Sequence, residues 1–586
     1  MRAESPEIAT SSSTPPVPEG SIPGASTSQP SLAAGFSPAR ARDPRRIAPG
    51  RARTYSHAVR SFDVAVVGAG HNGLVTAAYL ARAGLSVVVL EAQDRVGGAC
   101  VSEETWEGFR VSTAAYVVSL FRPEIVRDLD LARHGYRVLR RDPSSFTPLP
   151  DGRSLLLGRD AAMNRREVAK FSARDAERLP EYEAMLDRIA RAIEPTLLET
   201  PPALSTRPRD LWRLARMGWR FLRLGPDAPR AAEILTGAAR PILDRWFESD
   251  ALKATLATDA IIGAAASPST PGTAYVLFHH VMGQVDGARG VWGYVQGGIG
   301  KLPEAIATAA RAHGAEIRTS ARVARVRIGP HGADGVVLAD GTEIAARRVA
   351  SSADATVTLL GLVGTERLAP EIVSAVRSID YASGSMKINL ALSALPEFTA
   401  LPGAPGPQHR GTIHVAPSLE YLESAFDDAR RGEPSAEPIL ECTIPSVVDP
   451  SVAPPGRHLM QIFVQYAPYQ LRSGSWDELK ERFADRCLEV LGRYAPGVTR
   501  SVIARQVLSP LDIERRFGLT GGNIFQGAMT PSQLFFLRPF VGYADYRTPV
   551  PRLYLCGAAT HPGGGVMGAC GYNAAREILR DARRRR

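Results

Sequence analysis

The hydrophobic pattern first becomes regular at Phe62. Phe62 to Val67 is a short apolar run rich in β-branched residues, as in a buried strand, and a helical pattern follows it to Ala83. A second run of strand length, Ser86 to Leu90, has the same character. The order strand, helix, strand within about 30 residues predicts a βαβ unit.

The pattern then changes along the chain. It is mainly helical, with interrupting prolines, from Glu167 to about Gly263, and it turns to short strands from Ala321 to Ile344, where Asp340-Gly341 predicts a hairpin turn. Residues 380–470 alternate strands with Pro/Gly loops, and a last strand, Leu553 to Cys556, runs into a Gly-rich turn and a final helix. No apolar run reaches the length that spans a bilayer.

Length and charge narrow the class of protein. A chain of 586 residues can bury at least two cores, and its 44% hydrophobic and 22% charged residues are ordinary for a folded protein. The net charge is +10, but residues 1–60 and 576–586 contribute +4 each. The near-neutral body predicts no nucleic-acid partner. Residues 1–60, rich in Ser, Pro, Ala and Gly, predict a disordered tail.

The cysteines argue against metal and thiol chemistry. The five are widely spaced, without a metal-type pair, so no metal site is expected. Disulfide reduction needs two thiols close together, but Cys100 is followed by Thr105 where the second thiol would stand.

A glycine motif follows the first strand. Gly68, Gly70 and Gly73 form GxGxxG, which allows a tight turn, close approach to a pyrophosphate and close packing of helix on strand. The next strand ends in Glu91, 18 residues after Gly73, where a carboxylate can bind a ribose hydroxyl. The pattern predicts a dinucleotide site.

The residues after Glu91 resemble a known superfamily. Glu91-Ala92-Gln93-Asp94-Arg95-Val96-Gly97-Gly98 is similar to the E-x-x-x-R-x-G-G segment of FAD-dependent amine oxidases and phytoene desaturases. Gln296 to Ala305 resembles the GGxGxLPEAL segment of phytoene dehydrogenase-related proteins, and Leu553 to Gly568 resembles their terminal LYLCG…HPGGGVxG motif. No second GxGxxG occurs, so we expect no nicotinamide domain.

The resemblance implies the fold and its boundaries. We predict an α/β protein with an FAD-binding βαβ (Rossmann-like) domain, built from discontinuous segments, and an inserted α+β substrate domain. The predicted segments are a disordered tail (1–60), a first FAD-binding segment (61–150), a helical substrate or lid region (151–284), a second FAD-binding segment (285–365), a substrate domain with a mixed sheet (366–545), a third FAD-binding segment (546–580) and a basic tail (581–586).

The resemblance also implies the cofactor, FAD, and its contacts. The residues expected to bind FAD are Gly68, Ala69, Gly70, His71, Asn72, Gly73, Glu91, Ala92, Arg95, Gly97, Gly98, Val323, Gly557, Ala558 and Met567.

Two residues are candidates for catalysis. Lys387 stands where an amine oxidase could place the lysine that holds a water near flavin N5; the competing interpretation is an exposed strand lysine. His561, beside the ring-facing turn, could donate a hydrogen bond to a flavin oxygen. His279 and His280 are expected to be structural.

The function implied is FAD-dependent oxidation of an apolar or alkene-bearing small molecule, with oxygen or a quinone as electron acceptor. The alternatives are a flavin-dependent isomerase, an amine oxidase, and a flavin-bound regulatory protein without turnover.

Arg209 to Leu224 forms an amphipathic pattern. Its arginines recur every three or four residues, on one face of a helix, and tryptophan and leucine fill the rest. This pattern fits a helix on a membrane surface, or a lid over the substrate tunnel with a solvated outer face. We expect a cytoplasmic protein that can contact a membrane, or a mitochondrial-matrix one if the chain is eukaryotic.

Overall fold

The computed structural model describes residues 61–202, 206–285 and 287–584. The predicted disordered tail, residues 1–60, lies outside the described residues.

A five-stranded parallel sheet, in the order β11-β2-β1-β15-β21, forms the centre of the FAD-binding domain. Its strands are β1 (Val64–Val67), β2 (Val87–Leu90), β11 (Glu316–Arg318), β15 (Val349–Ser351) and β21 (Leu553–Leu555). They come from three separated stretches of the chain, as predicted for a discontinuous Rossmann-like domain.

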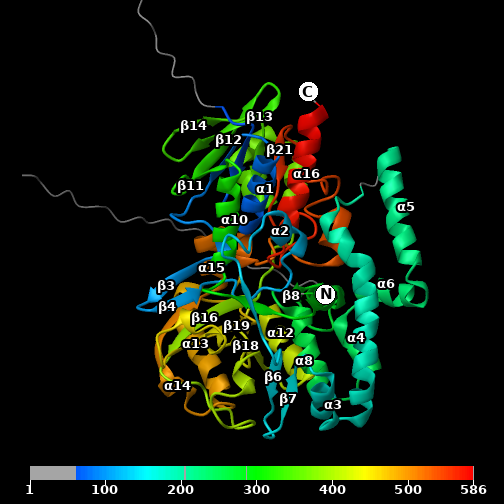
Figure 1. Cartoon of the computed structure of the whole chain (residues 1–586), viewed down its shortest axis with the longest axis vertical. Helices are drawn as coiled ribbons and strands as arrows, with labels where there is room; N and C mark the ends of the chain where they lie inside the picture. Colours follow the sequence, from blue (N-terminus) through cyan, green and yellow to red (C-terminus); the bar gives the residue numbers. More distant parts are fainter. Residues whose placement is uncertain (1–60, 203–205, 286, 585–586) are drawn as a thin grey trace, which may run out of the picture. The chain divides into compact units, whose positions relative to one another are not determined.

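Both faces of this sheet are covered, which explains why its strands are almost entirely apolar. Val64 and Val66 pack in one core with helices α1 (His71–Arg82), α10 (Lys301–Ala312) and α16 (Ala569–Arg584). Ala65 and Val67 pack in another with an antiparallel sheet of β12 (Val323–Gly329), β13 (Gly332–Leu338) and β14 (Glu343–Ala345). Figure 1 shows the three helices beside the parallel sheet.

The predicted hairpin at Asp340-Gly341 is confirmed. Val336 on β13 pairs with Ile344 on β14. Gly341 has φ +88°, a left-handed conformation that glycine adopts without strain.

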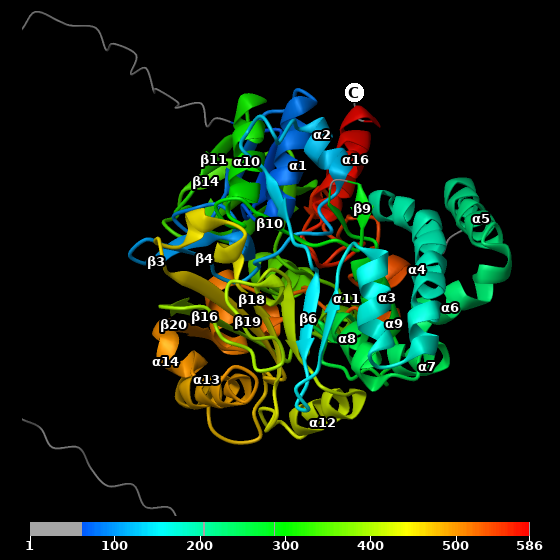
Figure 2. The ribbon, with the colours of Figure 1, turned by 60° about the horizontal axis from the view of Figure 1, so that its bottom comes forward.

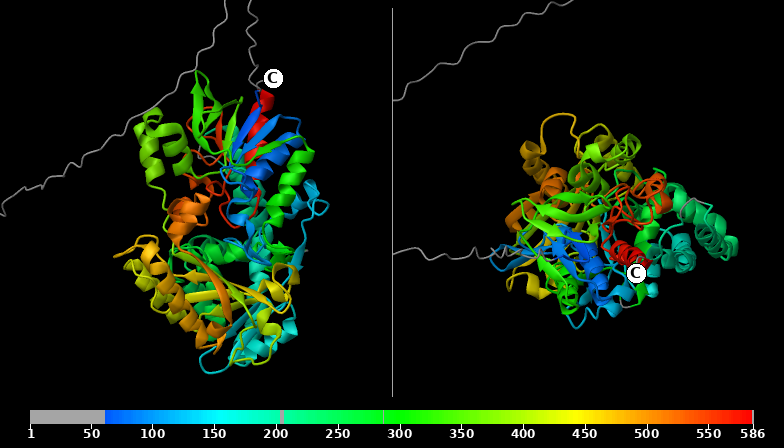
Figure 3. Two further views of the ribbon diagram at one scale, coloured as in Figure 1. Left: turned by 90° about the vertical axis from the view of Figure 1, so that its left-hand side faces the viewer. Right: turned by 90° about the horizontal axis from the view of Figure 1, so that it is seen from above.

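The inserted domain contains a seven-stranded sheet in the order β20-β16-β19-β18-β17-β6-β7. Its strands are β6 (Ser145–Pro148), β7 (Ser154–Leu157), β16 (Ser385–Leu392), β17 (Thr412–Val415), β18 (Ile439–Thr443), β19 (His458–Gln465) and β20 (Val502–Leu508). Figure 3 shows this sheet at the opposite end of the described chain from β12–β14.

One predicted boundary is wrong. The expected first FAD-binding segment extends to residue 150, but β6 pairs in parallel with β17 of the substrate sheet, Ser145 facing Thr412. The chain therefore enters the substrate domain before residue 145. The signal is missing from the sequence because the partner strand lies far away along the chain.

The predicted helical stretch is confirmed, and its helices gather on one flank of the substrate sheet, with α5 outermost (Figure 2). They are α3 (Ala161–Ala169), α4 (Ala173–Ile193), α5 (Pro208–Leu222), α6 (Ala228–Thr236), α7 (Ala239–Trp246), α8 (Asp250–Ile261) and α9 (Thr273–Val281). Other elements near the site are β3 (Ser102–Trp106), β4 (Phe109–Ser112), α2 (Pro123–Asp128), β5 (Val138–Arg140), β10 (Gly293–Val295), α12 (Leu419–Arg430), α13 (Trp476–Gly492) and α15 (Pro510–Phe517).

The predicted basic tail begins too early. Residues 581–584 continue helix α16, and the Asp581 carboxylate accepts hydrogen bonds from Arg547 and from the Tyr554 hydroxyl. In the described ranges, no helix is both long and apolar enough to cross a membrane.

Candidate flavin and substrate site

The turns after β1 and β21 meet at Ser352, the residue that follows β15. The Ser352 hydroxyl donates to the carbonyl oxygen of Val67 (3.0 Å). A Cβ on Gly557 would lie 2.0 Å from the Ser352 carbonyl oxygen, so the two backbones are in close contact. The predicted diphosphate turn and the predicted ring-facing turn therefore lie together at the carboxyl edge of the parallel sheet, where ligands bind in such folds.

The three motif glycines have different surroundings. Gly68 has φ +87°, and a Cβ there would lie 2.4 Å from the Ser352 hydroxyl oxygen. A Cβ on Gly73 would lie 2.2 Å from the Gly68 carbonyl oxygen, so this glycine lets helix α1 pack on the turn. Around Gly70 no atom lies within 4 Å of the Cβ position. Of the three, Gly70 therefore leaves open space at the start of α1, where a phosphate would approach.

Glu91 holds the turn to the end of β2. Its carboxylate accepts hydrogen bonds from the backbone amides of Ala69 (2.7 Å) and Gln93 (3.0 Å). The side chain is buried at the cavity wall. It both fixes the turn and stands where the resemblance implies a ribose contact.

One continuous cavity of about 1030 Å³ runs along this edge and into the substrate domain. Twelve of the predicted FAD residues line it: Gly68, Gly70, His71, Asn72, Glu91, Ala92, Arg95, Gly97, Gly98, Val323, Gly557 and Ala558. Ala69, Gly73 and Met567 do not line it; Met567 packs in a small core with Leu120. Sequence reasoning missed Arg322, Ser352, Ala353 and Val566, which do.

These residues fit an FAD. The cavity volume is at the upper end of the range for small-molecule sites, so it has room for a dinucleotide and a substrate. The open space at Gly70 faces the N-terminus of α1, whose unpaired amides and dipole favour a diphosphate.

Lys387 lies in the cavity wall and is not the exposed strand lysine of the competing interpretation. Its side chain is 2% exposed, and its Nζ has no hydrogen-bond partner among the described residues. Nζ lies 3.4 Å from the centroid of the Tyr116 ring. Burial holds the pKa of Lys387 well below its ordinary value, which favours the neutral amine.

The structure does not bring His561 to the cavity. His561 is buried, and its Nε2 donates to the carbonyl oxygen of Thr196 (3.0 Å), so the ring stabilises a loop. His279 similarly bonds the Gly564 carbonyl oxygen (3.1 Å) and is structural, as expected. His280, expected to be structural as well, lines the cavity.

The cysteines are all buried and form no disulfide. Cys100 lines the cavity with its Sγ 3.7 Å from His71 Nδ1. Burial raises the pKa of its thiol to about 12, so it stays protonated near neutral pH.

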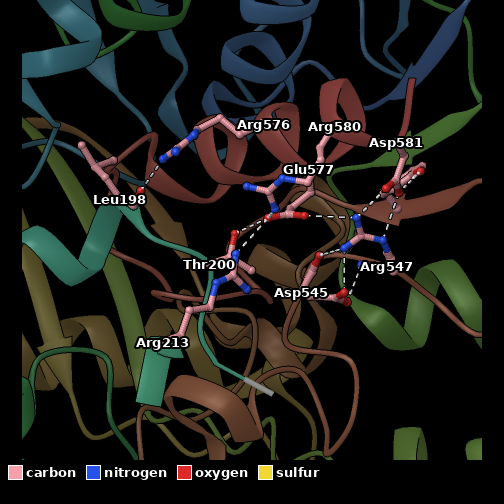
Figure 4. A network of polar contacts seen from close by, with 10 residues as sticks. Leu198, Thr200, Arg213, Asp545, Arg547, Arg576, Glu577, Arg580 and Asp581 are labelled. Carbon is pink, nitrogen blue, oxygen red and sulfur yellow. Dashed lines mark hydrogen bonds and ion pairs between the residues drawn. The ribbon is translucent and has the colours of Figure 1, made fainter. Parts of the chain in front are cut away.

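Helix α5 turns its arginines toward the body of the protein. Arg216 and Arg220 pair with Glu199, and Arg213 lies 3.7 Å from Glu577 of α16 (Figure 4). The side chain of Arg209 lies outside the described residues. The solvated, charged outer face expected of a lid is therefore wrong: the exposed large side chains of α5 are Leu211, Trp212, Trp219 and Leu222.

Glu577 is the inner end of this attachment. It accepts a hydrogen bond from the Thr200 hydroxyl (2.6 Å) and pairs with Arg547 and Arg580 (Figure 4). Burial alone would raise the pKa of Glu577, but the hydrogen bond and the two guanidinium groups lower it to about 2. The carboxylate is therefore ionised at physiological pH.

A family model described as flavin containing amine oxidoreductase matches residues 73–579. The chain belongs to this family and is an FAD-dependent oxidoreductase, as the fold and the cavity indicate.

Two relatives and one solved structure show the extent of the similarity. The chain is 47% identical over 543 residues to pyridine nucleotide-disulfide oxidoreductase domain-containing protein 2 of Rattus norvegicus, covering 89% of this chain and 94% of that protein. It is 28% identical to a limonene dehydrogenase polypeptide of Castellaniella defragrans, covering 89% and 95%. A triple mutant of putrescine oxidase shares the fold, with a TM-score of 0.56, 17% identity, and coverage of 90% and 99%.

Proposed function

We propose that this flavoenzyme oxidises an apolar or alkene-bearing small molecule. The observation that supports this proposal is the wall of the cavity beyond the flavin turns, which is rich in aliphatic and aromatic side chains. They include Leu120, Leu157, Leu186, Leu277, Met386 and Phe463. Such a wall binds a lipophilic molecule by removing its surface from water.

The chemistry divides between the cofactor and the chain. FAD supplies the acceptor for the electrons removed from the substrate when it is bound. The chain orients the substrate, excludes water and sets the charge near the reacting atoms. With one dinucleotide motif in the sequence, we propose oxygen or a quinone as the final acceptor. The similarity to a limonene dehydrogenase supports an alkene substrate.

Oxidation of an amine is the second candidate. It is favoured by Lys387, because a buried, neutral amine beside the cavity is able to hold a water or accept a proton. The Arg141 guanidinium, which also lines the cavity, argues against it by repelling a substrate ammonium.

An anaerobic flavin-reduction assay separates these candidates. We expect terpenoid alkenes such as limonene to bleach the oxidised-flavin absorbance of the purified holoenzyme, and Lys387→Met to change this rate little. The exposed Lys170→Met is the matched control. If only amines bleach the flavin, and Lys387→Met slows them by about 100-fold, the enzyme is an amine oxidase. Geometric isomers formed only with pre-reduced enzyme, without net oxidation, would indicate an isomerase.

We also infer that the enzyme contacts a membrane surface through α5. Leu211, Trp212, Trp219 and Leu222 are 51%, 60%, 53% and 76% exposed, on one face of the helix. Arg223 lies 3.8 Å from the Trp219 ring centroid, so a cation accompanies the aromatic side chain at this face. Tryptophan beside arginine is typical of helices at the headgroup level of a bilayer.

This contact would serve the proposed reaction. Helix α4, next to α5, contributes Leu179, Tyr182 and Leu186 to the cavity wall. A lipophilic substrate dissolves in a bilayer far better than in water. We therefore propose a cytoplasmic enzyme, or a matrix enzyme if the chain is eukaryotic, that takes its substrate from a membrane face.

A further inference from the structure

Four cavity side chains form one row across the substrate sheet. Lys387 on β16 pairs with Phe463 on β19, Phe463 pairs with Glu441 on β18, and Glu441 pairs with His414 on β17. All four line the cavity. Neighbouring strands lie about 4.8 Å apart, so the row extends over roughly 14 Å.

The Lys387 end of the row lies near the flavin motif. Lys387 stands over the ring of Tyr116. The residue before this tyrosine, Ala115, donates its backbone amide to the Ala99 carbonyl oxygen (3.0 Å), directly after Gly98. A substrate that reacts at the flavin therefore has its reacting group near this end.

Arg141 stands at the other end. It follows strand β5 and is 2% exposed. Its Nη1 donates to the hydroxyl of Thr412 (2.7 Å), which lies two residues before His414 and so on the same face of β17. The guanidinium carbon lies 5.4 Å from the centroid of the Tyr294 ring. The side chain is thus held rigidly at the cavity wall.

The Arg141 guanidinium is incompletely partnered. Its Nε makes no hydrogen bond, and across the described ranges no carboxylate lies within 4.0 Å of its nitrogens. Arginine keeps its charge in proteins, and a buried charge without a partner is unfavourable. The group is therefore prepared for an anion that enters the cavity.

The neighbouring acids do not supply that anion near neutral pH. Burial, and then the charge of Asp259, raise the pKa of Glu441 to about 8. Burial also raises the pKa of Asp259. Burial lowers the pKa of His414 to about 3 and that of His280 below its ordinary value, so both rings are neutral. Arg141 is the dominant charge at this end of the cavity.

We propose that Arg141 binds the carboxylate of a lipophilic substrate, with the hydrocarbon chain lying along the row toward Lys387. The inference rests on the proposed function, because it describes the substrate of the same cavity. A planar guanidinium with a free Nε matches a carboxylate in two parallel hydrogen bonds. The substrate class is therefore a carboxylic acid with an oxidisable chain, not a neutral hydrocarbon.

Calorimetric titration of the FAD-loaded protein at neutral pH tests this, with decanoate, decan-1-ol and decylamine as probes. We expect decanoate to bind best. Arg141→Gln should weaken decanoate binding by about 10- to 100-fold and leave decanol binding unchanged. The exposed neighbour Arg140 supplies the control, Arg140→Gln. If Arg141→Gln does not fold, Arg141→Lys, which keeps the charge but not the planar fork, should show a smaller loss for decanoate alone.

The outcomes separate this inference from the proposed function. Decanoate binding that is absent, or equal in wild type and Arg141→Gln, overturns the carboxylate site even if alkenes reduce the flavin. Tighter binding of decylamine also overturns it and assigns the cavity end to Glu441 and Asp259. Decanoate binding that depends on Arg141, without flavin reduction by any alkene, supports the site and removes the proposed function.

Discussion

Glu441 shows how burial sets the charge of single residues in this cavity. It lies on β18 between His414 and Phe463, and the neutral His414 ring stands 3.8 Å from its carboxyl group. Burial and the charge of Asp259 raise its pKa to about 8, from an ordinary 4.5. The carboxyl is therefore protonated in the folded state at a pH where the unfolded chain ionises it.

We predict that Glu441 makes stability fall with rising pH. The folded-state pKa is raised, so its contribution is fully present below pH 4.5 and is lost as pH rises toward 8. Glu441→Gln cannot ionise, so its free energy of unfolding should gain on the wild type by a few kcal/mol between pH 5 and 8. Urea unfolding across this range measures the difference. The exposed Glu420→Gln is the control; parallel curves for Glu441→Gln and wild type would contradict the prediction.

The residues that sequence reasoning missed share a physical feature. Arg141, Glu441 and Asp259 gain their role from burial beside one another, and they come from β5, β18 and α8. No local motif marks such residues. Lys387 is recognisable as a candidate, but its burial cannot be read from the alternation of β16, because both faces of that strand are covered. The prediction for His561 is wrong because proximity in sequence to a flavin turn does not fix the direction of a side chain.

At the scale of elements, the β1–α1 turn was predictable because its chemistry is local. Strand, glycines and helix follow one another within a few residues, and each glycine answers a steric demand of the turn. The pairing of β6 with β17 was not predictable, since it joins residues more than 260 positions apart. Parallel strands carry no turn signal between them.

The turn leads to a prediction about Gly70. This residue has φ −64°, and its Cβ position is open, so Gly70→Ala should change the stability of the apoprotein by less than about 1 kcal/mol. The methyl group should obstruct the diphosphate and weaken FAD binding by about 10- to 100-fold. Flavin content and apoprotein titration measure this. Gly73→Ala is the contrast: its Cβ would meet the Gly68 carbonyl oxygen, so it should destabilise the fold itself. Unchanged FAD affinity in Gly70→Ala would remove the diphosphate from this turn.

At the scale of the whole described chain, α5 joins the two ends of the function. Arg213, which lies near Glu577, and the pairs of Arg216 and Arg220 with Glu199 hold it against the FAD-binding domain and the helical region. Since these arginines face inward, they contribute little to attraction by anionic lipids. The apolar outer face must then supply most of the membrane binding.

Vesicle co-sedimentation tests this arrangement. We expect the protein to pellet with phosphatidylcholine vesicles, with only a modest gain from about 30% phosphatidylglycerol and little loss in high salt, because apolar burial is not screened. Replacing Trp212, Trp219 and Leu222 with serine should reduce the bound fraction about fivefold. The control replaces Ile503 and Val541, which are exposed elsewhere at 52% and 71%, with serine. Equal pelleting of the two variants would refute the membrane face. So would sedimentation velocity that shows a concentration-dependent dimer lost only in the α5 variant, because a second copy of the chain would then cover this face.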